Sequence, residues 1–316
     1  MAHPLKVFLY HHTVTAKLYN IIRNYRRDRF NKLSDEEFAQ MMYKEHTGEG
    51  LDLKNPRTFD EKVWYLKLHE RDPLQTKCTD KYEVREYVKG CGLGHILNEV
   101  YGIYDSFKTV PFDQLPDRFF MKCTHTSGAN AIFDRNKPFD YKYQKNEFDF
   151  WMKRNYFWGS REWNYKDIKP HIICEKILED KNGKLPMDYK FMCFNGQVKL
   201  LFLNIGLATA TGEHADDAFC NIYDRDFKLL PIKDERENYL EKEIPKPDNW
   251  EEMIQYAEIL SKPFKHCRVD FYNVDGKIYF GELTFTSLGG FMNYFTPDFL
   301  KKAGSLFSIE DFKKKK

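Results

Sequence analysis

The sequence contains no long apolar run. No stretch of its 316 residues approaches the roughly 20 consecutive apolar residues that a membrane-spanning helix needs, so an integral membrane protein is excluded. Residues 1–20 also lack an apolar core followed by a small-residue cleavage site, which argues against a secretory signal. Both absences favour a cytoplasmic protein.

An excess of charge of one sign is also missing. Lys and Arg together number 50 and Asp and Glu 48, which gives a formal net charge of +2. A dedicated nucleic-acid-binding protein normally carries a strong basic excess, so nucleic acid is not expected as a partner. Disorder is excluded because 42% of the residues are hydrophobic and 16% are aromatic. The length fits one large α/β body or two closely joined units.

The cysteines lack the spacing of a metal site. There are seven, none of them in a CxxC pair, whereas zinc sites are built from clustered ligands. Cys123, Cys174, Cys193 and Cys267 lie in or beside apolar, strand-like runs, where a free thiol behaves as a small hydrophobic group. We therefore expect reduced, structural cysteines.

The chain begins and ends with basic segments. Lys17–Arg29 holds four arginines and one lysine, while Leu18, Ile21, Ile22 and Tyr25 recur at helical spacing. This pattern predicts an amphipathic helix with a cationic face, which either packs on the body of the protein or docks on an anionic membrane surface. Residues 313–316 are all lysine, and they form either a solvated tail or an addition to the same attraction.

Helices are expected early in the chain and antiparallel hairpins later. Residues 34–70 predict two helices separated by Asn55-Pro56, the second beginning with a capping box of Thr58 and Glu61. Further helices are expected at 80–89, 148–156 and 250–261, with an irregular loop at 159–169. Strands are expected at 118–123, 131–133, 171–178, 188–194, 197–204, 267–272 and 277–283, with turns at Asn195-Gly196 and Asp275-Gly276. The predicted fold class is α+β (mixed α/β) with antiparallel sheets.

Several polar residues on the predicted strands indicate a site for a nucleotide and a metal. A strand ends at Lys122, before a loop of small residues whose backbone N–H groups can hold phosphate oxygens. Asp270 and Glu282 lie on two strands of one hairpin, where carboxylates on the same side can bind Mg²⁺ together with substrate phosphates. Arg268 points to the same face as Asp270 and offers a forked donor to phosphate. Two further segments belong to the same predicted site. They are the apolar strand 172–178 and the segment 188–190.

The order of these segments resembles the ATP-grasp superfamily, and within it the teichuronopeptide-biosynthesis (TupA-like) ATP-grasp family. The resemblance covers most of the chain, about residues 50–305. It is carried by the Lys122 loop and by the segments Asn55–Phe59, Asp80–Arg85, Gly159–Trp163, Ile168–Pro170, Asp188–Phe191, Arg268–Asp270 and Gly281–Phe285.

The resemblance implies an ATP-grasp fold, in which two α+β subdomains sandwich ATP after an N-terminal helical and α/β portion. The expected divisions are a basic helical segment at 1–50, an N-terminal portion at 51–111, subdomain A at 112–175, subdomain B with the metal site at 176–305, and a Lys-rich tail at 306–316.

The resemblance also implies which residues contact ATP. The phosphates would be contacted by Lys81, Lys122, Ser127, Gly128 and Lys190. Adenine would be recognised by Glu175 and by the backbones of Lys176 and Leu178. The ribose would be held by Asp188. Together with Lys122 and Lys190, Arg268 would act in catalysis by steadying the phosphoryl group as it moves.

Mg²⁺ would be held by Asp270, Glu282 and Thr284. Many ATP-grasp proteins have Asn where this chain has Thr284, and the shorter side chain leaves open whether one or two ions bind.

The acceptor side is predicted from loops. Its candidate residues are His125, Arg161, Trp163, Ser287, Gly289 and Gly290. An Arg can pair with a carboxylate and a Trp can stack on a sugar, but the same residues also serve as packing residues or ion pairs. The serine and glycines could cradle an acyl phosphate or simply form a turn, and the histidine could be a base or a structural hydrogen-bonding group.

The function implied by the resemblance is ATP-dependent carboxylate–amine ligation. The γ-phosphate would move to a carboxylate, and an amine would then displace it from the acyl phosphate. The expected partners are a uronic-acid sugar, sugar nucleotide or capsular polysaccharide and an amine or amino acid, with peripheral contact to the inner membrane. A kinase or glycosyltransferase of the same pathway, or a nucleotide-binding module without turnover, remain alternatives. The oligomeric state is not predicted.

Overall fold

The computed structural model describes residues 8–11, 13–28, 30–207, 217–233, 236–292 and 295–310. The predicted lysine tail at 313–316 lies outside the described residues. Within them, no helix combines the length and the apolar character that crossing a membrane requires.

Helices precede the sheets, and those with defined bounds in the described part of the chain are α2 (Thr13–Asp28), α3 (Asp35–Thr47), α4 (Phe59–His69), α5 (Pro73–Thr79) and α6 (Val84–Gly90). The predicted break at Asn55-Pro56 is confirmed, since it separates α3 from α4. The predicted capping box is confirmed as well. Thr58 accepts the Glu61 N–H and Glu61 accepts the Thr58 N–H, so two otherwise unpaired N–H groups of α4 are satisfied.

The first sheet has four antiparallel strands in the order β1-β4-β2-β3. Its strands are β1 (Val100–Tyr104), β2 (Arg118–Cys123), β3 (Asn130–Asp134) and β4 (Ile172–Glu175). Phe119, Met121 and Phe133 of this sheet pack with Phe148 of α7 (Tyr141–Met152) in one apolar core. Residues 120 and 122 alternate with these apolar residues, so they point to the other face.

The second sheet has five antiparallel strands in the order β7-β6-β5-β8-β9. They are β5 (Asp188–Phe194), β6 (Gln197–Ile205), β7 (Phe219–Asp224), β8 (His266–Val274) and β9 (Lys277–Thr284). Both predicted hairpin turns are confirmed. Asn195, Gly196, Asp275 and Gly276 all have positive φ, as a two-residue turn that matches the strand twist requires.

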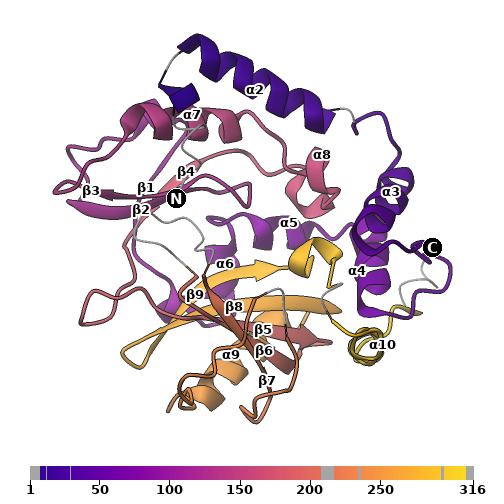
Figure 1. The fold of residues 1–316 in the computed structure, drawn as a ribbon. Helices are drawn as coiled ribbons and strands as arrows, with labels where there is room; N and C mark the ends of the chain where they lie inside the picture. The colour runs from indigo at the N-terminus through magenta and orange to yellow at the C-terminus, as the bar shows by residue number, and fades with distance from the viewer. Residues whose placement is uncertain are drawn as a thin grey trace.

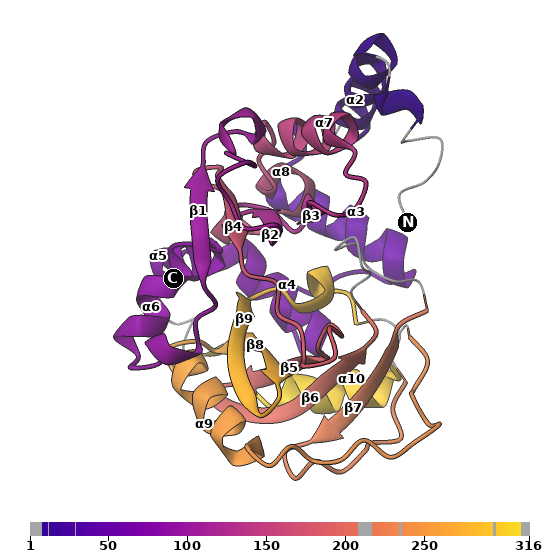
Figure 2. The same cartoon turned by 90° about the vertical axis from the view of Figure 1, so that its left-hand side faces the viewer.

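The two faces of the second sheet have different partners. One face packs on α9 (Trp250–Ser261), with Phe191, Val269 and Phe271 in the core. On the other face, Met192 and Phe202 pack with α4 and with α10 (Pro297–Ser305). Asp188, Lys190, Arg268 and Asp270 share this second face by strand alternation, but they lie beyond its apolar part. Figures 1 and 2 both show the four-stranded sheet between α7 and the five-stranded sheet.

Several predicted boundaries were wrong. The helix predicted at 148–156 is α7, which starts earlier because the Asp140 side chain accepts the Tyr143 N–H and caps it. The loop predicted at 159–169 contains the short helices α8 (Phe157–Ser160) and η3 (Trp163–Tyr165). The strands β1 and β7 were not predicted, and both are edge strands that form through pairing with one neighbour. The remaining short helices are η1 (Gly94–Ile96), η2 (Phe107–Thr109) and η4 (Ser287–Gly290).

Candidate active site

A cleft between the two sheets holds most of the predicted site residues. Its apolar end is lined by Phe120, Ile132, Ile177, Leu178, Pro186, Leu207 and Phe280, together with Glu175 and Lys176. Its charged end is lined by Ser127, Glu162, Lys190, Arg268, Asp270, Glu282 and Thr284, among others. Lys81, Lys122, Asp188 and Tyr272 line both ends, so the two form one continuous cleft.

Lys122 of β2 and Glu175 of β4 form an ion pair at the junction of the two ends. The pair follows from the register of the strands, in which Lys122 lies opposite Ile173 and Glu175 opposite Phe120. The Lys122 Nζ atom is 2.6 Å from Glu175 Oε1, and both side chains are less than one-fifth exposed. An amino group and a carboxylate thus lie side by side next to an apolar pocket.

Lys81 reaches the cleft from the turn before α6. The Asp80 carboxylate accepts the N–H groups of Tyr82 and Glu83 and so fixes this turn. The Lys81 Nζ atom donates to the Thr126 carbonyl oxygen at 2.8 Å. Burial lowers the pKa of Lys81, and the nearby Glu282 carboxylate opposes this shift.

The loop after Lys122 presents polar atoms to the cleft. Thr126 Oγ1 is buried and has no hydrogen-bond partner in the described part of the chain, although Thr126 lines the charged end. Ser127 lines the same end. Gly128 instead lies against Trp151, whose ring atoms would be 2.7 Å from an added Cβ, so this glycine allows close packing. A ligand with phosphate oxygens would satisfy the Thr126 hydroxyl.

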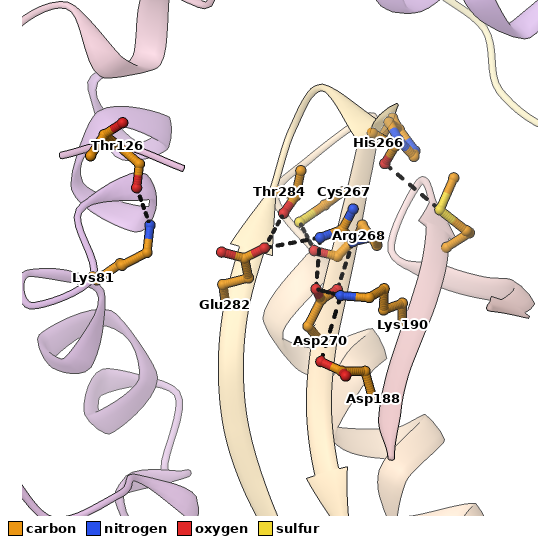
Figure 3. Close-up of polar contacts among 12 residues, drawn as sticks. Lys81, Thr126, Asp188, Lys190, His266, Cys267, Arg268, Asp270, Glu282 and Thr284 are labelled. Carbon is orange, nitrogen blue, oxygen red and sulfur yellow. Dashed lines mark hydrogen bonds and ion pairs between the residues drawn. The ribbon is translucent and has the colours of Figure 1, made fainter. Parts of the chain in front are cut away.

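Arg268, Asp270, Glu282 and Lys190 form a compact network on the second sheet (Figure 3). Arg268 donates to both Asp270 oxygens at 2.7 Å and to Glu282 Oε1 at 2.9 Å. Lys190 Nζ donates to Asp270 Oδ2 at 3.0 Å and lies 3.7 Å from Asp188 Oδ1. The register explains the cluster, because Asp270 lies directly between Lys190 on β5 and Glu282 on β9.

The network has strong electrostatic effects. Desolvation in the cleft favours protonation of Glu282, but Lys81 and Arg268, with Lys190 and Lys122, lower its pKa to about 2. Burial opposes the charge of Lys190, yet Asp270 and Asp188 raise the pKa of this amine. Burial raises the pKa of the Asp188 carboxyl. Glu282 and Lys190 therefore remain charged at neutral pH.

The carboxylates fit Mg²⁺ held jointly with phosphate. Asp270 and Glu282 are cross-strand partners whose oxygens share one arginine, so both can face a single ion. Thr284 Oγ1 donates to Glu282 Oε1 at 3.2 Å. Among the described residues, no group of three or more His, Cys, Asp or Glu side chains could hold a metal. Substrate phosphates would have to supply the other ligands.

Arg161 and Trp163 do not line the cleft. The Arg161 side chain is fully buried, donates to the carbonyl oxygens of Phe30, Leu33 and Trp158, and pairs with Asp35. Trp163 is half-buried, with the Arg71 guanidinium 5.5 Å from its ring centre. These contacts tie α8 and η3 to the N-terminal helices, so we leave both residues out of the proposed site.

The other predicted acceptor residues are divided. Ser287 and Gly289 line the charged end, but the Ser287 hydroxyl lies 3.2 Å from His266 Nε2 and the Gly289 N–H donates to Thr286. Gly290 packs against Trp64, whose Nε1 would be 3.0 Å from an added Cβ. The buried His125 shares a hydrogen bond with the Trp151 carbonyl oxygen, and burial lowers its pKa. Neither Gly290 nor His125 lines the cleft.

Several residues that line the cleft were not predicted as site residues, among them Tyr272 and three residues around α8 and η3. Tyr272 follows Asp270 by two residues on β8, so strand alternation could have indicated it. Tyr156, Glu162 and Tyr165 line the charged end from the loop around α8 and η3. They lie within or beside the same segment as Arg161 and Trp163, and no local pattern in this segment indicates which of its side chains turn toward the cleft.

A comparison with models of protein families identifies one family. A model of the family described as TupA-like ATPgrasp matches residues 61–308. No curated protein matches the chain.

Some solved structures resemble parts of this chain at low sequence identity. They include the D-alanine–D-alanine ligases of Bacillus anthracis (16% identity, TM-score 0.40, 73% of this chain, 63% of that chain) and Helicobacter pylori (13%, 0.42, 79%, 69%). Another is the L-amino acid ligase of Bacillus licheniformis (12%, 0.46, 81%, 57%). The chain thus spans less than two thirds of the Bacillus anthracis and Bacillus licheniformis enzymes.

Proposed function

The chain belongs to the TupA-like ATP-grasp family, whose model matches residues 61–308, and we propose that its cleft joins a carboxylate to an amine with ATP. The observation that carries this proposal is the network of Arg268, Asp270 and Glu282 facing Lys81 across the cleft. Phosphoryl transfer depends mainly on positioning and on neutralising charge, and this arrangement offers both.

The nucleotide is proposed to lie along the length of the cleft. The apolar end fits a base, with Glu175 and the backbones of Lys176 and Leu178 positioned to recognise adenine. Asp188, at the junction, would accept from the ribose hydroxyls. The phosphates of the nucleotide would then reach the charged end of the cleft, where Ser127 and the buried Thr126 hydroxyl lie.

The lysines are proposed to change partners when the phosphates bind. Lys122 is paired with Glu175, and Lys190 is paired with Asp270. Phosphate oxygens would draw both amino groups away, and Asp270 and Glu282 would then hold Mg²⁺. The bound ion supplies charge neutralisation for the phosphates. Arg268 would steady the phosphoryl group as it moves to the substrate carboxylate.

A screen for ADP release tests this proposal. Uronic-acid sugars, free and nucleotide-linked, are each combined with Mg-ATP and a panel of amines. We expect ADP and phosphate to form only when both a carboxylate and an amine are present, with an amide as product. A stable phosphoester would instead support a kinase, and ATP binding without turnover across the panel would support a nucleotide-binding module.

The finer substrate assignment rests on the resemblance to the TupA-like family. We propose a uronic-acid carboxylate of a capsular or other cell-surface polysaccharide, or of its sugar precursor, joined to an amine or amino acid. Such an enzyme would act in the cytoplasm, where ATP and activated sugars are available.

We further propose that α2 binds the inner face of a membrane, because it turns its polar side toward the body. Arg23 Nη1 donates to Glu147 Oε1 and to the Tyr10 hydroxyl, both at 2.7 Å. The Tyr10 hydroxyl donates to Glu147 at 2.8 Å, and the Arg23 guanidinium lies 3.7 Å from the Phe150 ring centre. This polar network holds α2 against α7, and Figure 1 shows the two helices next to each other.

The apolar row of α2 faces solvent as a result. The exposed side chains are Val14 (79%), Leu18 (57%), Ile21 (63%), Ile22 (45%) and Tyr25 (76%). Spacings of three and four residues keep them on one face of the helix. An anionic lipid surface fits this row best, because the helix also carries basic residues. A second copy of the chain would bring like charges together.

Vesicle sedimentation tests the role of α2. We expect the protein to sediment with vesicles containing phosphatidylglycerol and much less with pure phosphatidylcholine. The double variant Leu18→Glu and Ile21→Glu should lose this binding while keeping its affinity for ATP. The matched variant Lys108→Glu, on an exposed turn far along the chain, should bind as wild type does. Unchanged sedimentation of the double variant, or a dimer that depends on α2, would contradict membrane docking.

A further inference from the structure

The charged end of the cleft continues past the metal carboxylates to a group of residues with no assigned role. Glu162, Tyr156 and Tyr165 line this part of the cleft together with Thr286. None of the three lines the apolar end, where we place adenine. A ligand at this group would therefore approach the phosphoryl-transfer region from the side opposite the base.

Glu162 is a buried carboxylate on the wall of the cleft. Only 6% of the residue is exposed, and its N–H donates to the Ser160 hydroxyl at 3.1 Å, which fixes its backbone after α8. A carboxylate in such a place needs a compensating positive charge or hydrogen-bond donors. An ammonium group entering the cleft could supply both.

Two tyrosine rings line the same part of the cleft as this carboxylate. The ring centres of Tyr156 and Tyr165 are 4.6 Å apart, with the planes tilted by 52°. The faces of aromatic rings attract cations, and a neighbouring carboxylate strengthens that attraction. The combination of one carboxylate and two rings favours an amine in its ammonium form over a neutral or anionic ligand.

Lys67 influences Glu162 from behind the cleft wall. Its Nζ atom donates to the Gly289 carbonyl oxygen at 3.0 Å and lies 3.6 Å from the Trp64 ring centre, and Lys67 is not among the residues lining the cleft. Burial raises the pKa of Glu162 to about 7, while Lys67, Thr286 and Arg268 oppose this shift and Glu282 adds to it. Glu162 can thus gain and lose a proton near neutral pH.

We propose that Glu162, Tyr156 and Tyr165 bind the amine substrate as its ammonium ion, and that Glu162 accepts the proton the amine must lose. This proposal rests on the ligase function proposed above. After Glu162 takes that proton, the amine nitrogen attacks the carbonyl carbon of the acyl phosphate. The new N–C bond forms, the bond from carbon to the phosphate oxygen breaks, and phosphate leaves with the electron pair. The second proton lost by nitrogen passes to solvent.

Saturation-transfer NMR on the full chain tests the binding step without knowledge of the true substrate. The probes are n-propylammonium and the neutral n-propanol, each added to protein loaded with Mg²⁺ and a non-hydrolysable ATP analogue. We expect saturation transfer to n-propylammonium and little to n-propanol. Glu162→Gln should reduce the ammonium signal at least about fivefold, and Tyr156→Leu should also reduce it. Glu86→Gln, on the exposed surface, should leave it unchanged.

A second measurement addresses the proton. Hydroxylamine is largely unprotonated at neutral pH, so it needs no base to become a nucleophile. With any carboxylate that supports ADP release, Glu162→Gln should lose turnover with alkylamines and retain it with hydroxylamine. The nucleotide affinity of each variant, measured separately, shows that the rest of the cleft is intact.

The results of these experiments distinguish a failure of the proposed ammonium site at Glu162, Tyr156 and Tyr165 from a failure of the proposed ligase function. Equal ammonium signals in wild type and Glu162→Gln, or equal signals from n-propanol, would overturn the subsite. Equal loss of turnover with alkylamines and hydroxylamine would overturn the role of Glu162 as proton acceptor. Absence of ATP binding in the wild type would instead overturn the proposed ligase, whatever the amine probes show.

Discussion

At the scale of single residues, the site depends on charges that neutralise one another. Arg268 and Lys190 are held by Asp270, and Glu282 is held by Arg268. Removing one carboxylate therefore releases a cation and, in the proposed function, also removes a ligand for Mg²⁺. Substituting Asp275, a carboxylate in the turn of the same hairpin, should have neither of these two effects.

Asp270→Asn and Glu282→Gln should each lower ADP release by about 100-fold or more, because both remove charge from the phosphoryl-transfer site. Steady-state kinetics over a range of Mg²⁺ concentrations measure this loss, and thermal unfolding checks that each variant is folded. Asp275→Asn is the matched control, since Asp275 lies in the turn of the same hairpin and Asn tolerates its positive φ. Full activity of both variants would remove these carboxylates from the metal site.

Lys122→Ala should raise the Kd for ATP by roughly 10-fold, the effect of losing a charge-assisted hydrogen bond. The effect is not larger because the wild-type lysine must first leave Glu175, 2.6 Å away, to reach the phosphate. Isothermal titration calorimetry measures the change, with Lys108→Ala on the exposed surface as control. Unchanged affinity would place Lys122 outside the nucleotide site.

Asp60 should make the stability of the protein depend on pH. Its carboxylate accepts the Met292 N–H at 3.0 Å, and burial raises its pKa from 3.8 to about 7. The folded protein binds this proton more tightly than the unfolded chain, so the group's contribution to stability declines as pH rises from about 4 to 7 and is absent above that range. Asp60→Asn, which carries no proton to lose, should gain stability relative to wild type between pH 5 and pH 8.

Chemical denaturation of both proteins at the two pH values measures this difference. The fully exposed Asp113 provides the control, because Asp113→Asn should change stability equally at both values. A difference between Asp60→Asn and wild type that does not grow with pH would show that Asp60 is ionised in the folded protein at pH 5.

At the scale of elements, strands and capped helices were the best predicted parts. The two β-hairpins were identified from Asn-Gly and Asp-Gly, since these residues adopt the positive φ that both turns require. The helix 250–261 and the start of α4 were also predicted correctly. By contrast, β1 and β7 were missed, because neither is joined to its neighbouring strand by an Asn-Gly or Asp-Gly turn and a local pattern does not reveal the pairing.

The contact between α10 and α4 depends on a glycine. A Cβ at Gly304 would lie 2.2 Å from the Arg57 carbonyl oxygen and within 2.9 Å of the backbone of Thr58 and Phe59. These backbone atoms cannot move aside without disturbing the start of α4. Gly304→Ala should therefore lower the free energy of unfolding by roughly 2 kcal/mol.

Denaturant unfolding measures the effect of Gly304→Ala. Gly50→Ala is the matched control, because Gly50 has open space around its Cβ position and no positive φ. If the two variants are equally stable, α10 is not held as closely against α4 as the structure describes.

At the scale of the whole molecule, the match to the TupA-like family over residues 61–308 confirms the predicted family and with it the ATP-grasp fold. The predicted subdomain limits at residues 112, 175 and 305 remain a prediction. Each sheet is formed by one continuous part of the chain after α6, and the cleft between them takes residues from both.

A nucleotide between two sheets should stabilise the whole protein. Mg-ATP at 100 times its Kd should raise the free energy of unfolding by about 2.7 kcal/mol, since it binds only the folded cleft. Thermal unfolding with and without Mg²⁺ measures this, and Glu282→Gln should reduce the part that depends on Mg²⁺. An unfolding midpoint unaffected by Mg-ATP would argue against nucleotide binding in this cleft.

The sequence by itself predicted the family and the main hairpins, because motif spacing and strand alternation are local properties. It also predicted that one site would contain Lys122, Asp188, Lys190, Arg268, Asp270 and Glu282, and all six line the cleft. Only the tertiary structure decided which loop side chains enter the cleft. Arg161 and Trp163 pack toward the N-terminal helices, whereas their neighbour Glu162 faces the cleft. It also decided that α2 packs through its polar side and exposes its apolar row. Both outcomes depend on contacts with distant segments, α3 in one case and α7 in the other, and no local pattern encodes such contacts.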